Sequence, residues 1–295
     1  MIKIDEVDFY LEDLKSKFRK LNNVGGYSKY YLSYSGGKDS HFLYWFIREY
    51  TDEFKDIQVV GINTYMEHHE ILKRILKNSD IVLYPKLKPM EIKAKYGIPC
   101  FSKIQDEFID RYQRGSRCKS LMDRVTGYQF IGTDNIKHKS SFQLNKKAKE
   151  MLLTNRLHKI SNKCCKYLKK DVAKEYEKQS GKKSILGIRG AEGMMRKSQY
   201  KSCFTKELKF TPLYDLSDEL LDKIYNKYHI EIPKVYEHIK RTGCMGCPYG
   251  SYKGDTEKEL ALLNEAQRKF VMTYFKESYD VLGIHYQSSI YDYMR

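Results

Sequence analysis

The sequence predicts an α/β fold with a doubly wound parallel sheet. Along the N-terminal part of the chain, short apolar stretches with the length of strands alternate with longer stretches of helical periodicity. A Gly-Gly turn joins the first of these strands to the helix that follows it. Because strands that alternate with helices pair in parallel through right-handed crossovers, we expect one sheet covered by helices on both faces.

The N-terminal elements follow from the spacing of apolar residues. Steps of three and four predict an amphipathic helix over about Asp5–Leu21, which the glycines at 25 and 26 end. A tyrosine-rich strand over Lys29–Ser35 leads through the glycine turn into an apolar helix over Phe42–Tyr50. A strand, a helix and a further strand are then expected over Ile57–Asn63, Glu67–Lys77 and Ile81–Tyr84.

The rest of the chain has a weakly patterned middle and a more regular end. Residues from Pro85 to about Ile160 are polar and basic, and their weak periodicity defines no individual element. Beyond them the pattern predicts helix Lys163–Gln179, strand Ser184–Ile188, helix Asp218–Tyr228 and one long amphipathic helix over about Thr256–Tyr279.

Composition favours a globular protein of the cytoplasm. The chain has 295 residues with 41% hydrophobic content, enough for one sizeable core with an appended subdomain. Charges at Lys3, Asp5, Glu6 and Asp8 interrupt any N-terminal apolar run, and no stretch approaches the length of a membrane span, so we expect neither a signal peptide nor a membrane partner. Seven cysteines in a reducing compartment favour metal binding or thiol chemistry over disulfides.

The formal net charge of +16 is concentrated in one block of the sequence. Lys137–Lys170 contains eleven Lys or Arg residues and one acidic residue, Glu150. Such a block can attract nucleic acid or anionic nucleotides, and it can also be a solvated lysine-rich face. Charge alone leaves these alternatives open.

Residues 35–40, Ser-Gly-Gly-Lys-Asp-Ser, have the features of an anion-binding loop. Two glycines after a strand allow a tight turn with exposed N–H groups, and the following helix directs its positive N-terminus to the same point. Lys38 adds a full charge, Ser35 and Ser40 add hydroxyl donors, and Asp39 can hold Mg²⁺ or orient a hydroxyl when a triphosphate is bound. A simple glycine turn is the alternative.

This hexapeptide resembles the loop of the PP-loop ATP pyrophosphatase superfamily and differs from a Walker A loop. The resemblance implies that the loop holds the pyrophosphate of ATP with Mg²⁺, and that the bond between the α and β phosphates is cleaved to adenylate a substrate. In the sulfonucleotide reductase branch the same loop grips a phosphosulfate nucleotide. The nucleotide-binding residues implied here are Ser33, Ser35, Gly36, Gly37, Lys38, Asp39 and Ser40.

A second candidate motif occupies residues 187–196, Gly-Ile-Arg-Gly-Ala-Glu-Gly-Met-Met-Arg. It follows a predicted strand, which places Arg189, Glu192 and Arg196 at the edge where open parallel sheets bind ligands. Two guanidinium groups can clamp sulfate or phosphate oxygens while Glu192 holds one of them, and an ordinary surface ion-pair set is the alternative. The stretch resembles the Gly-x-Arg-x-x-Glu-x-x-x-Arg motif of phosphoadenylyl sulfate (PAPS) reductases, which implies nucleotide binding by all three residues and catalytic roles for Lys38, Asp39, Arg189 and Arg196.

Four cysteines form a third candidate site. Cys164 and Cys165 precede a predicted helix, and Cys244 and Cys247 lie in a glycine-rich Cys-x-x-Cys turn. A vicinal pair can point the same way at a helix start, where the helix dipole offsets negative charge; Lys163, Lys166 and Arg241 would add to this effect. An iron–sulfur cluster, zinc and reduced structural thiols all remain open from the residues alone.

The combination of Cys-Cys with Cys-x-x-Cys resembles the [4Fe-4S] ligand set of adenylyl sulfate reductases and of related DNA phosphorothioation enzymes. The resemblance to the PAPS reductase family extends over about Lys29–Tyr252. It implies an adenine nucleotide alpha hydrolase-like fold divided into an N-terminal helix (1–28), a nucleotide-binding α/β domain (29–240) and a small helical subdomain with the Cys-x-x-Cys turn (241–295). Cys100, Cys118 and Cys203 are expected to be small buried residues.

One departure from that family bears on the reaction. Assimilatory reductases have a nucleophilic cysteine in a Cys-Gly-x-His tail, whereas no cysteine follows Cys247 here. We therefore expect an adenylating enzyme of sulfur transfer, with a sulfur-donor protein as partner and a nucleic-acid substrate that the basic block would suit. The alternatives are a sulfonucleotide reductase that uses Cys118 or Cys203, and a noncatalytic nucleotide-sensing protein.

Overall fold

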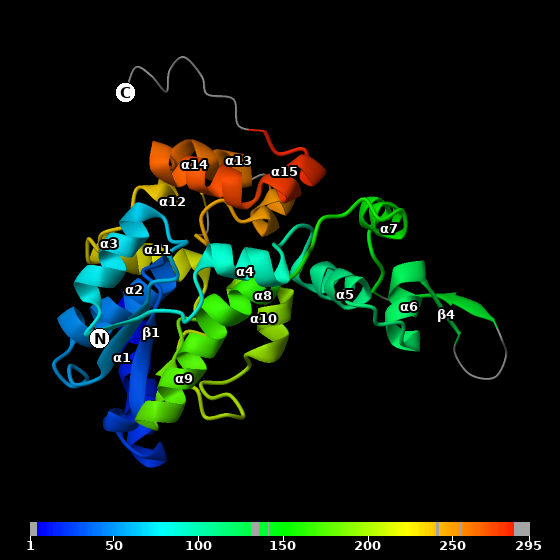
Figure 1. The fold of residues 1–295 in the computed structure, drawn as a ribbon. Helices are drawn as coiled ribbons and strands as arrows, with labels where there is room; N and C mark the ends of the chain where they lie inside the picture. Colours follow the sequence, from blue (N-terminus) through cyan, green and yellow to red (C-terminus); the bar gives the residue numbers. More distant parts are fainter. Residues whose placement is uncertain (1–4, 131–135, 141, 240–241, 254, 286–295) are drawn as a thin grey trace. The chain divides into compact units, whose positions relative to one another are not determined.

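The computed structural model describes residues 5–130, 136–140, 142–239, 242–253 and 255–285, and its central feature is a four-stranded parallel sheet (Figure 1). The strand order is β3-β2-β1-β6. The chain places β2 and then β3 on one side of β1 and later adds β6 on the other side of β1. The predicted doubly wound α/β fold is confirmed. The strands are β1 (Tyr30–Tyr34), β2 (Gln58–Ile62), β3 (Ile81–Leu83) and β6 (Lys183–Ile185).

The chain forms two compact units, each assembled from separate stretches of sequence. We call them the sheet unit and the cysteine unit. The sheet unit comprises Met1–Asn63, His69–Pro85 and Asp171–Glu237, and the cysteine unit comprises Thr64–His68, Lys86–Lys170 and His238–Arg295.

This division differs from the linear one predicted from the sequence. The helix within 1–28 is part of the sheet unit, and the segment 29–240 is shared by both units. The segment 241–295 shares a buried core with residues 86–170; Ile92 and Leu168 pack in one cluster with Leu260 and Phe275. A short C-terminal segment buries too little apolar surface to fold alone, which explains why it joins the middle of the chain.

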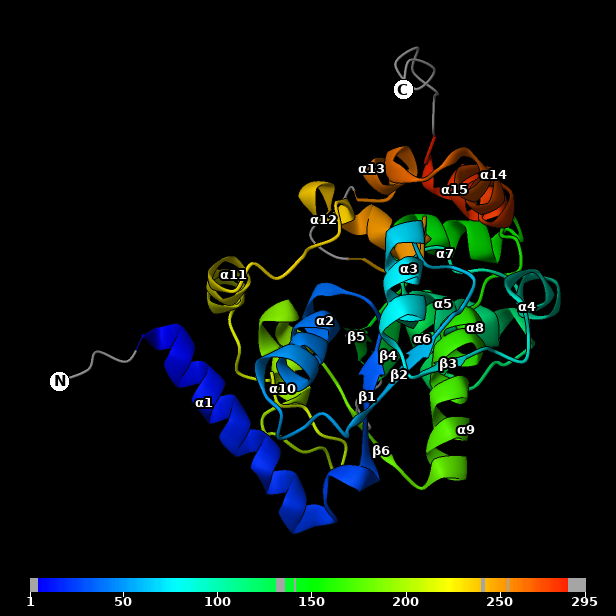
Figure 2. The same cartoon turned by 90° about the vertical axis from the view of Figure 1, so that its left-hand side faces the viewer.

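Helices of the sheet unit cover both faces of the sheet. In Figure 2 the strands lie between α2 (Lys38–Trp45) and α9 (Asp171–Ser180). Successive side chains of β1 point to opposite faces, so Tyr31 contacts Tyr176 of α9 at a ring-centroid distance of 4.9 Å, whereas Tyr34 bonds to α2. The other helices here are α1 (Glu6–Arg19), α3 (His69–Asn78), α10 (Met194–Gln199) and α11 (Asp218–Lys227), with a π-helical turn at Phe46–Tyr50 and 3-10 turns at Lys20–Val24, Tyr27–Lys29 and Gly190–Glu192.

The cysteine unit is mostly helical. The middle of the chain, to which the sequence assigns no element, forms short helices and an antiparallel hairpin with Tyr128 opposite Lys139. Within the described residues, none of the helices is both long and apolar enough to cross a membrane. The elements are α4 (Pro89–Tyr96), α5 (Lys103–Gln113), α6 (Lys119–Thr126), β4 (Tyr128–Phe130), β5 (Lys137–Lys139), α7 (Lys146–Leu153), α8 (Lys163–Cys165), a π turn at Lys166–Lys170, a 3-10 turn at Pro248–Lys253, α13 (Asp255–Leu262), α14 (Glu265–Tyr274) and α15 (Lys276–Leu282); α12 (Val235–His238) lies at the unit boundary.

The single long helix predicted over Thr256–Tyr279 is wrong, because α13, α14 and α15 replace it. Asn264 has an extended backbone, and its side chain accepts a 2.9 Å hydrogen bond from the N–H of Gln267. This is an N-cap, which begins a new helix instead of continuing the previous one. Apolar periodicity persists across the break, so the pattern alone suggests continuity.

A buried hydrogen-bond chain joins three elements of the sheet unit. The Asn78 side chain of α3 donates to the Tyr34 hydroxyl at 3.0 Å, and that hydroxyl lies 3.0 Å from Nδ1 of His41 in α2. Burial, with a smaller effect of the Arg74 charge, lowers the pKa of His41 to about 3. The ring is therefore neutral near pH 7, and its Nδ1 can accept a hydrogen bond from the Tyr34 hydroxyl.

We predict that His41 makes the protein acid-sensitive. In the unfolded chain His41 regains its ordinary pKa near 6.5, so the unfolded state binds an extra proton between about pH 6.5 and 3. Stability must then fall as the pH drops through this window, by at most about 1.4 kcal/mol per pH unit from this residue. Urea midpoints at pH 7 and pH 5 should converge in His41→Asn, which keeps an acceptor but cannot be protonated. An unchanged pH dependence in this variant would assign the acid sensitivity to other groups, such as His158.

Candidate functional site

The loop between β1 and α2 has the strand-loop-helix geometry that the sequence suggests. Gly37 caps α2, and Gly36 has a φ of 71°, which is unfavourable for residues with a side chain. A Cβ on Gly36 would lie 2.9 Å from the carbonyl oxygen of Ile71, so the loop is pressed against α3. Both features require glycine at position 36.

Hydroxyl groups hold the loop closed. The Ser40 Oγ accepts from the backbone N–H of Ser35 at 3.2 Å and lies 3.0 Å from the Ser35 hydroxyl. It also lies 3.1 Å from the Gly37 carbonyl oxygen, to which it can donate. Ser40 is buried while Ser35 is exposed, so Ser40 shapes the loop and Ser35 faces solvent. Ser33 is half-buried and lies within β1, two residues before Ser35.

Lys38 is surrounded by groups from the C-terminal part of the sheet unit. Its ammonium pairs with the carboxylate of Asp222 and lies 5.4 Å from the ring centre of Tyr225. The Tyr225 hydroxyl donates to the Lys38 carbonyl at 2.7 Å, and the Lys38 N–H donates to the Tyr236 hydroxyl at 3.0 Å. A phenol oxygen thus occupies an acceptor position at the N-terminus of α2, where an anion would otherwise be favoured.

Arg189 brings the second motif to the loop, although it lies 150 residues from Asp39. The residue is buried at 6% exposure, and its side chain donates to Asp39 Oδ1 and to Asp218 Oδ1 at 2.6 Å each. Burial opposes the charge, but the two carboxylates more than offset it and raise the pKa of Arg189. Gly187 permits this approach, because a Cβ there would lie 3.0 Å from the Asp39 carbonyl.

Glu192 orders the rest of the second motif. Its carboxylate accepts from the Arg189 N–H at 3.2 Å and pairs with the Arg196 guanidinium. Arg196 is a third exposed and Glu192 is nearly buried. The structure therefore brings Lys38, Asp39, Arg189 and Glu192 together, with Arg196 held through Glu192.

Helix α11 contributes site residues that neither motif contains. Asp218, Asp222 and Tyr225 lie on one face of this helix and contact the two cations or the loop backbone. Their spacing of four and then three residues was a usable signal, because such residues share a helix face. A predicted helix alone, however, does not indicate which element its face contacts.

This position in the sheet is a favourable one for a ligand. The loops after β1 and β6 meet where the strand order reverses, which is the place where open α/β sheets bind ligands at the carboxyl ends of strands. Helix N-terminal N–H groups, a lysine and two arginines there can bind an anion with several oxygens. The carboxylates of Asp39, Asp218 and Asp222 balance the cations in this structure.

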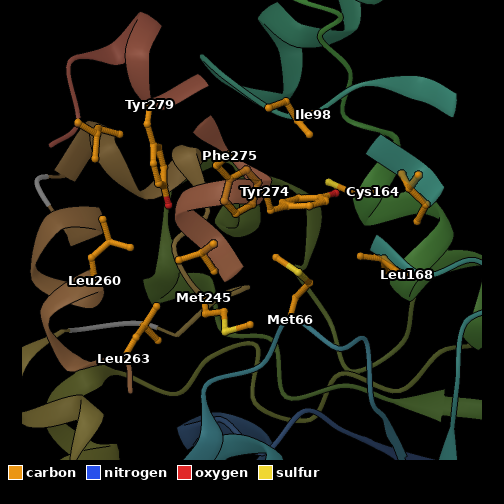
Figure 3. Packing of buried hydrophobic residues seen from close by; sticks show 13 residues of the cluster. Met66, Ile98, Cys164, Leu168, Met245, Leu260, Leu263, Tyr274, Phe275 and Tyr279 are labelled. Carbon is orange, nitrogen blue, oxygen red and sulfur yellow. The ribbon is translucent and has the colours of Figure 1, made fainter. Parts of the chain in front are cut away.

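The four cysteines predicted to act together are gathered in the cysteine unit. Cys164 and Cys165 lie in the first turn of a helix, as predicted, and Cys247 follows Cys244 in a tight turn closed by a 3.1 Å backbone hydrogen bond. Cys164 is buried in a cluster against which Cys165 and Cys244 pack, and Figure 3 shows the Cys164 thiol beside the ring of Tyr274. Burial, followed by the charges of Cys164, Cys244, Cys247 and Cys165, raises the pKa of Tyr274, so all four cysteines affect the same phenol.

The pKa values of the Cys164 and Cys165 thiols are shifted in opposite directions. A hydrogen bond from Cys164, followed by Lys103, Lys169 and Lys170, lowers the pKa of Cys165 to about 6 despite its burial. Its partner Cys164 has a raised pKa, because it donates that hydrogen bond and is buried. The pair holds one proton near neutral pH, and the negative charge lies on Cys165.

One lysine near the four cysteines was not among those predicted. Cys244 raises the pKa of Lys169 more than any other group does. Lys163 instead lies 3.8 Å from Asp110, and Lys166 lies 4.9 Å from the ring centre of Tyr167. Arg241 lies outside the described residues. Lys169 lies four residues after Cys165, one helical turn along the same face. The predicted contribution of Lys163 and Lys166 stays a prediction.

Among the residues that the structure describes, no group of three or more His, Cys, Asp or Glu side chains is arranged to hold a metal ion. The other cysteines follow the prediction only in part. Cys100 is buried, Cys203 is half-buried, and Cys118 is exposed. The expectation of a buried residue is wrong for Cys118, which precedes a surface helix.

Comparisons with known proteins gave matches among solved structures only. No protein-family model matches the chain, and no curated protein sequence matches it. The chain is similar to PAPS reductase from Candida auris in its phosphate complex, at 11% identity and a TM-score of 0.43 over 80% of this chain and 93% of that one. It is also similar to NH3-dependent NAD synthetase from Campylobacter jejuni, at 12% identity and a TM-score of 0.39 over 97% of this chain and all of that one.

We predict that Gly36→Ala destabilises the sheet unit by about 2 kcal/mol or more. A left-handed backbone costs a residue with a Cβ roughly 1–2 kcal/mol, and the contact with the Ile71 carbonyl adds to this cost. Gly26→Ala is the matched control, because Gly26 has a φ of 84° with nothing within 4 Å of its Cβ position. Urea unfolding should show a larger loss for Gly36→Ala; equal losses would mean that α3 does not constrain the loop.

Proposed function

We propose that this protein is a PP-loop enzyme of the PAPS-reductase-like type that binds ATP and cleaves it at the α-phosphate in sulfur-transfer chemistry. The observation that carries the proposal is the contact between the loop and the second motif through Arg189 and Asp39. Two motifs that separately resemble parts of one family meet at a position that favours ligands in this fold. A chance resemblance of either motif would not require this contact.

The residues present suit a triphosphate. The β and γ phosphates would lie on the N–H groups of α2, with Lys38 and the guanidinium groups of Arg189 and Arg196 on their oxygens. Phosphate oxygens would replace the Tyr236 hydroxyl and the Asp222 carboxylate at Lys38. Mg²⁺, when bound with ATP, would neutralise phosphate charge beside Asp39.

The proposed reaction uses these cations. An oxygen of the acceptor attacks the α-phosphorus, the bond to the β-phosphate oxygen breaks, and pyrophosphate leaves with the electron pair. The acceptor is then adenylated. In this proposal Lys38 and Arg189 would lie beside the leaving pyrophosphate, on which negative charge grows and where fixed positive charges lower the barrier most.

We further propose that Cys164, Cys165, Cys244 and Cys247 hold a [4Fe-4S] cluster, with zinc as the alternative. Cys165 and Cys244 pack against the buried cluster that contains Cys164, so the chain brings together thiols of the kind that such a cluster would need, and Lys169 would offset its negative charge. When bound, the cluster would supply sulfur or redox chemistry or stabilise the fold. A sulfur-donor protein and a nucleic-acid acceptor attracted by Lys137–Lys170 complete the proposal.

A second candidate function, sulfonucleotide reduction, is favoured by Cys118. Its thiol is exposed, and hydrogen bonds involving Ser120, the Leu121 N–H and Ser116 lower its pKa, with the charge of Arg111 acting in the same direction. A reactive thiolate of this kind can attack the sulfur of a phosphosulfate.

The deciding experiment compares nucleotide products. Anaerobically purified protein with ATP and Mg²⁺ should form AMP and pyrophosphate, and Lys38→Ala should weaken ATP binding at least tenfold, since a lost bond to a charged group costs about 1.5–3 kcal/mol. Lys178→Ala, an exposed lysine of α9, is the control for charge removal. Sulfite from adenylyl or phosphoadenylyl sulfate with a thiol reductant would favour the second function, and binding without turnover would indicate a nucleotide sensor.

We predict that Cys244→Ser removes the iron and lowers the stability of the cysteine unit. Wild-type protein purified anaerobically should be brown with about four iron atoms per chain, because each cysteine holds one corner of the cluster. Cys203→Ser, which changes a half-buried thiol of the sheet unit, should keep its iron. Colourless wild-type protein that is free of iron and binds zinc would contradict the cluster assignment.

A further inference from the structure

The cysteine unit contains a second site, a cavity of 420 Å³ between the end of α5 and the end of α7. We propose that it binds single-stranded nucleic acid, with a phosphate held by Arg117 and Lys159 and a base stacked on the Arg117 guanidinium. Its volume is in the range of small-ligand sites, roughly 300–1,000 Å³. Its lining residues are Asp110, Tyr112, Gln113, Arg114, Arg117, Leu152, Asn155 and Lys159.

Arg117 is held as a rigid platform. Its guanidinium carbon lies 3.7 Å from the ring centre of Tyr112, and its Nη1 donates to the carbonyls of Tyr112 and Ser116 at 2.8 Å each. The residue is exposed, so the guanidinium face turned away from Tyr112 is accessible. Bases stack on arginine planes in many single-stranded complexes, and a fixed plane loses little side-chain entropy when it does so.

Hydrogen bonds and an ion pair also hold the other lining residues in place. Arg114 makes a two-pronged pair with Asp110 at 3.0 and 2.8 Å. Gln113 donates to the His158 carbonyl and accepts from the Ile160 N–H, which fixes the segment before Cys164 to α5. Lys159 donates to the Lys95 carbonyl at 2.7 Å, which leaves its full charge uncompensated by that contact. Three cations face one carboxylate in the lining, so the cavity attracts anions.

The sequence stretch that contains the lining residues argues for nucleic acid over an acidic protein. Residues 103–159 contain thirteen Lys or Arg and six Asp or Glu, a net charge of +7. Cations also lie over aromatic rings, with Arg124 at 4.6 Å from Phe108 and Lys137 at 4.0 Å from Tyr128, and Tyr128 and Phe142 are exposed. A strand of alternating phosphates and flat bases uses both features, whereas an acidic peptide uses only the charges.

This inference deepens the proposed function, because it assigns a site to the nucleic-acid acceptor. Its test is independent of nucleotide chemistry. Fluorescence anisotropy measures the affinity of the full chain for labelled oligothymidylate and oligouridylate, and the two arms distinguish DNA from RNA. The double variant Arg117→Ala, Lys159→Ala should bind at least tenfold more weakly, and its salt slope should fall by about 0.7 for the one phosphate that both residues hold. Arg117→Lys should recover part of the affinity, since it keeps the charge and loses the plane.

Arg156→Ala is the matched control, because Arg156 is an exposed arginine of the same region that pairs with Glu150 and does not line the cavity. An equal loss in this variant, an unchanged affinity of the double variant, or equal competition by inorganic polyphosphate would overturn the inference. Pyrophosphate release separates the two proposals. If the double variant binds the oligonucleotides more weakly than the wild type but the wild type forms no pyrophosphate, the cavity assignment stands and the proposed adenylation fails.

Discussion

The buried guanidinium of Arg189 is the interaction on which the sheet unit's candidate site depends. A charge at 6% exposure is tolerated only when it is paired, and removal of one partner of a buried pair typically costs about 3–5 kcal/mol. Asp39 on the first loop and Asp218 on α11 provide the partners. Three elements far apart in the sequence are thereby fixed at the carboxyl end of β1. Because Gly187 lies against the Asp39 carbonyl, no side chain separates the two loops.

The features of the chain that depend on local sequence could be predicted. Strand β1, the glycine loop and α2 follow from apolar runs and glycine chemistry within a few residues, and their positions agree with the prediction to within a few residues. Helix α9 and strand β6 were found in the same way. The helix break at Asn264 could not be predicted, because the apolar periodicity continues across it. Asn264 acts as an N-cap because its own backbone is extended, and the sequence does not show that conformation.

The pairings across the chain could not be predicted in the same way. Asp222 meets Lys38 because α11 packs beside the loop, and this arrangement is a property of the whole unit. The order of the strands, with β6 beside β1, is likewise a long-range property. The four cysteines were expected to lie together because they resemble a known ligand set. The interaction of Lys169 with Cys244 depends on the conformation of the helical turn after Cys165, which a sequence pattern does not show. The cavity beside Arg117 lies in the stretch where periodicity is weakest.

The acceptors around Lys38 stabilise the loop without a ligand and are compatible with the polyphosphate binding that we propose. An N–H at a helix terminus needs an acceptor, and the neutral hydroxyl of Tyr236 meets that need without adding charge. Asp222 gives Lys38 a counter-ion, but its side chain is largely exposed, so solvent screens the pair and its net contribution is small. In the complex we propose, a polyphosphate would take the place of Asp222 as the counter-ion and would replace the Tyr236 hydroxyl with a charge-assisted hydrogen bond, which is roughly twice as strong as a neutral one. Exchange therefore costs the protein little for an anion with several oxygens, whereas a neutral ligand would have to compete with the tyrosine on equal terms.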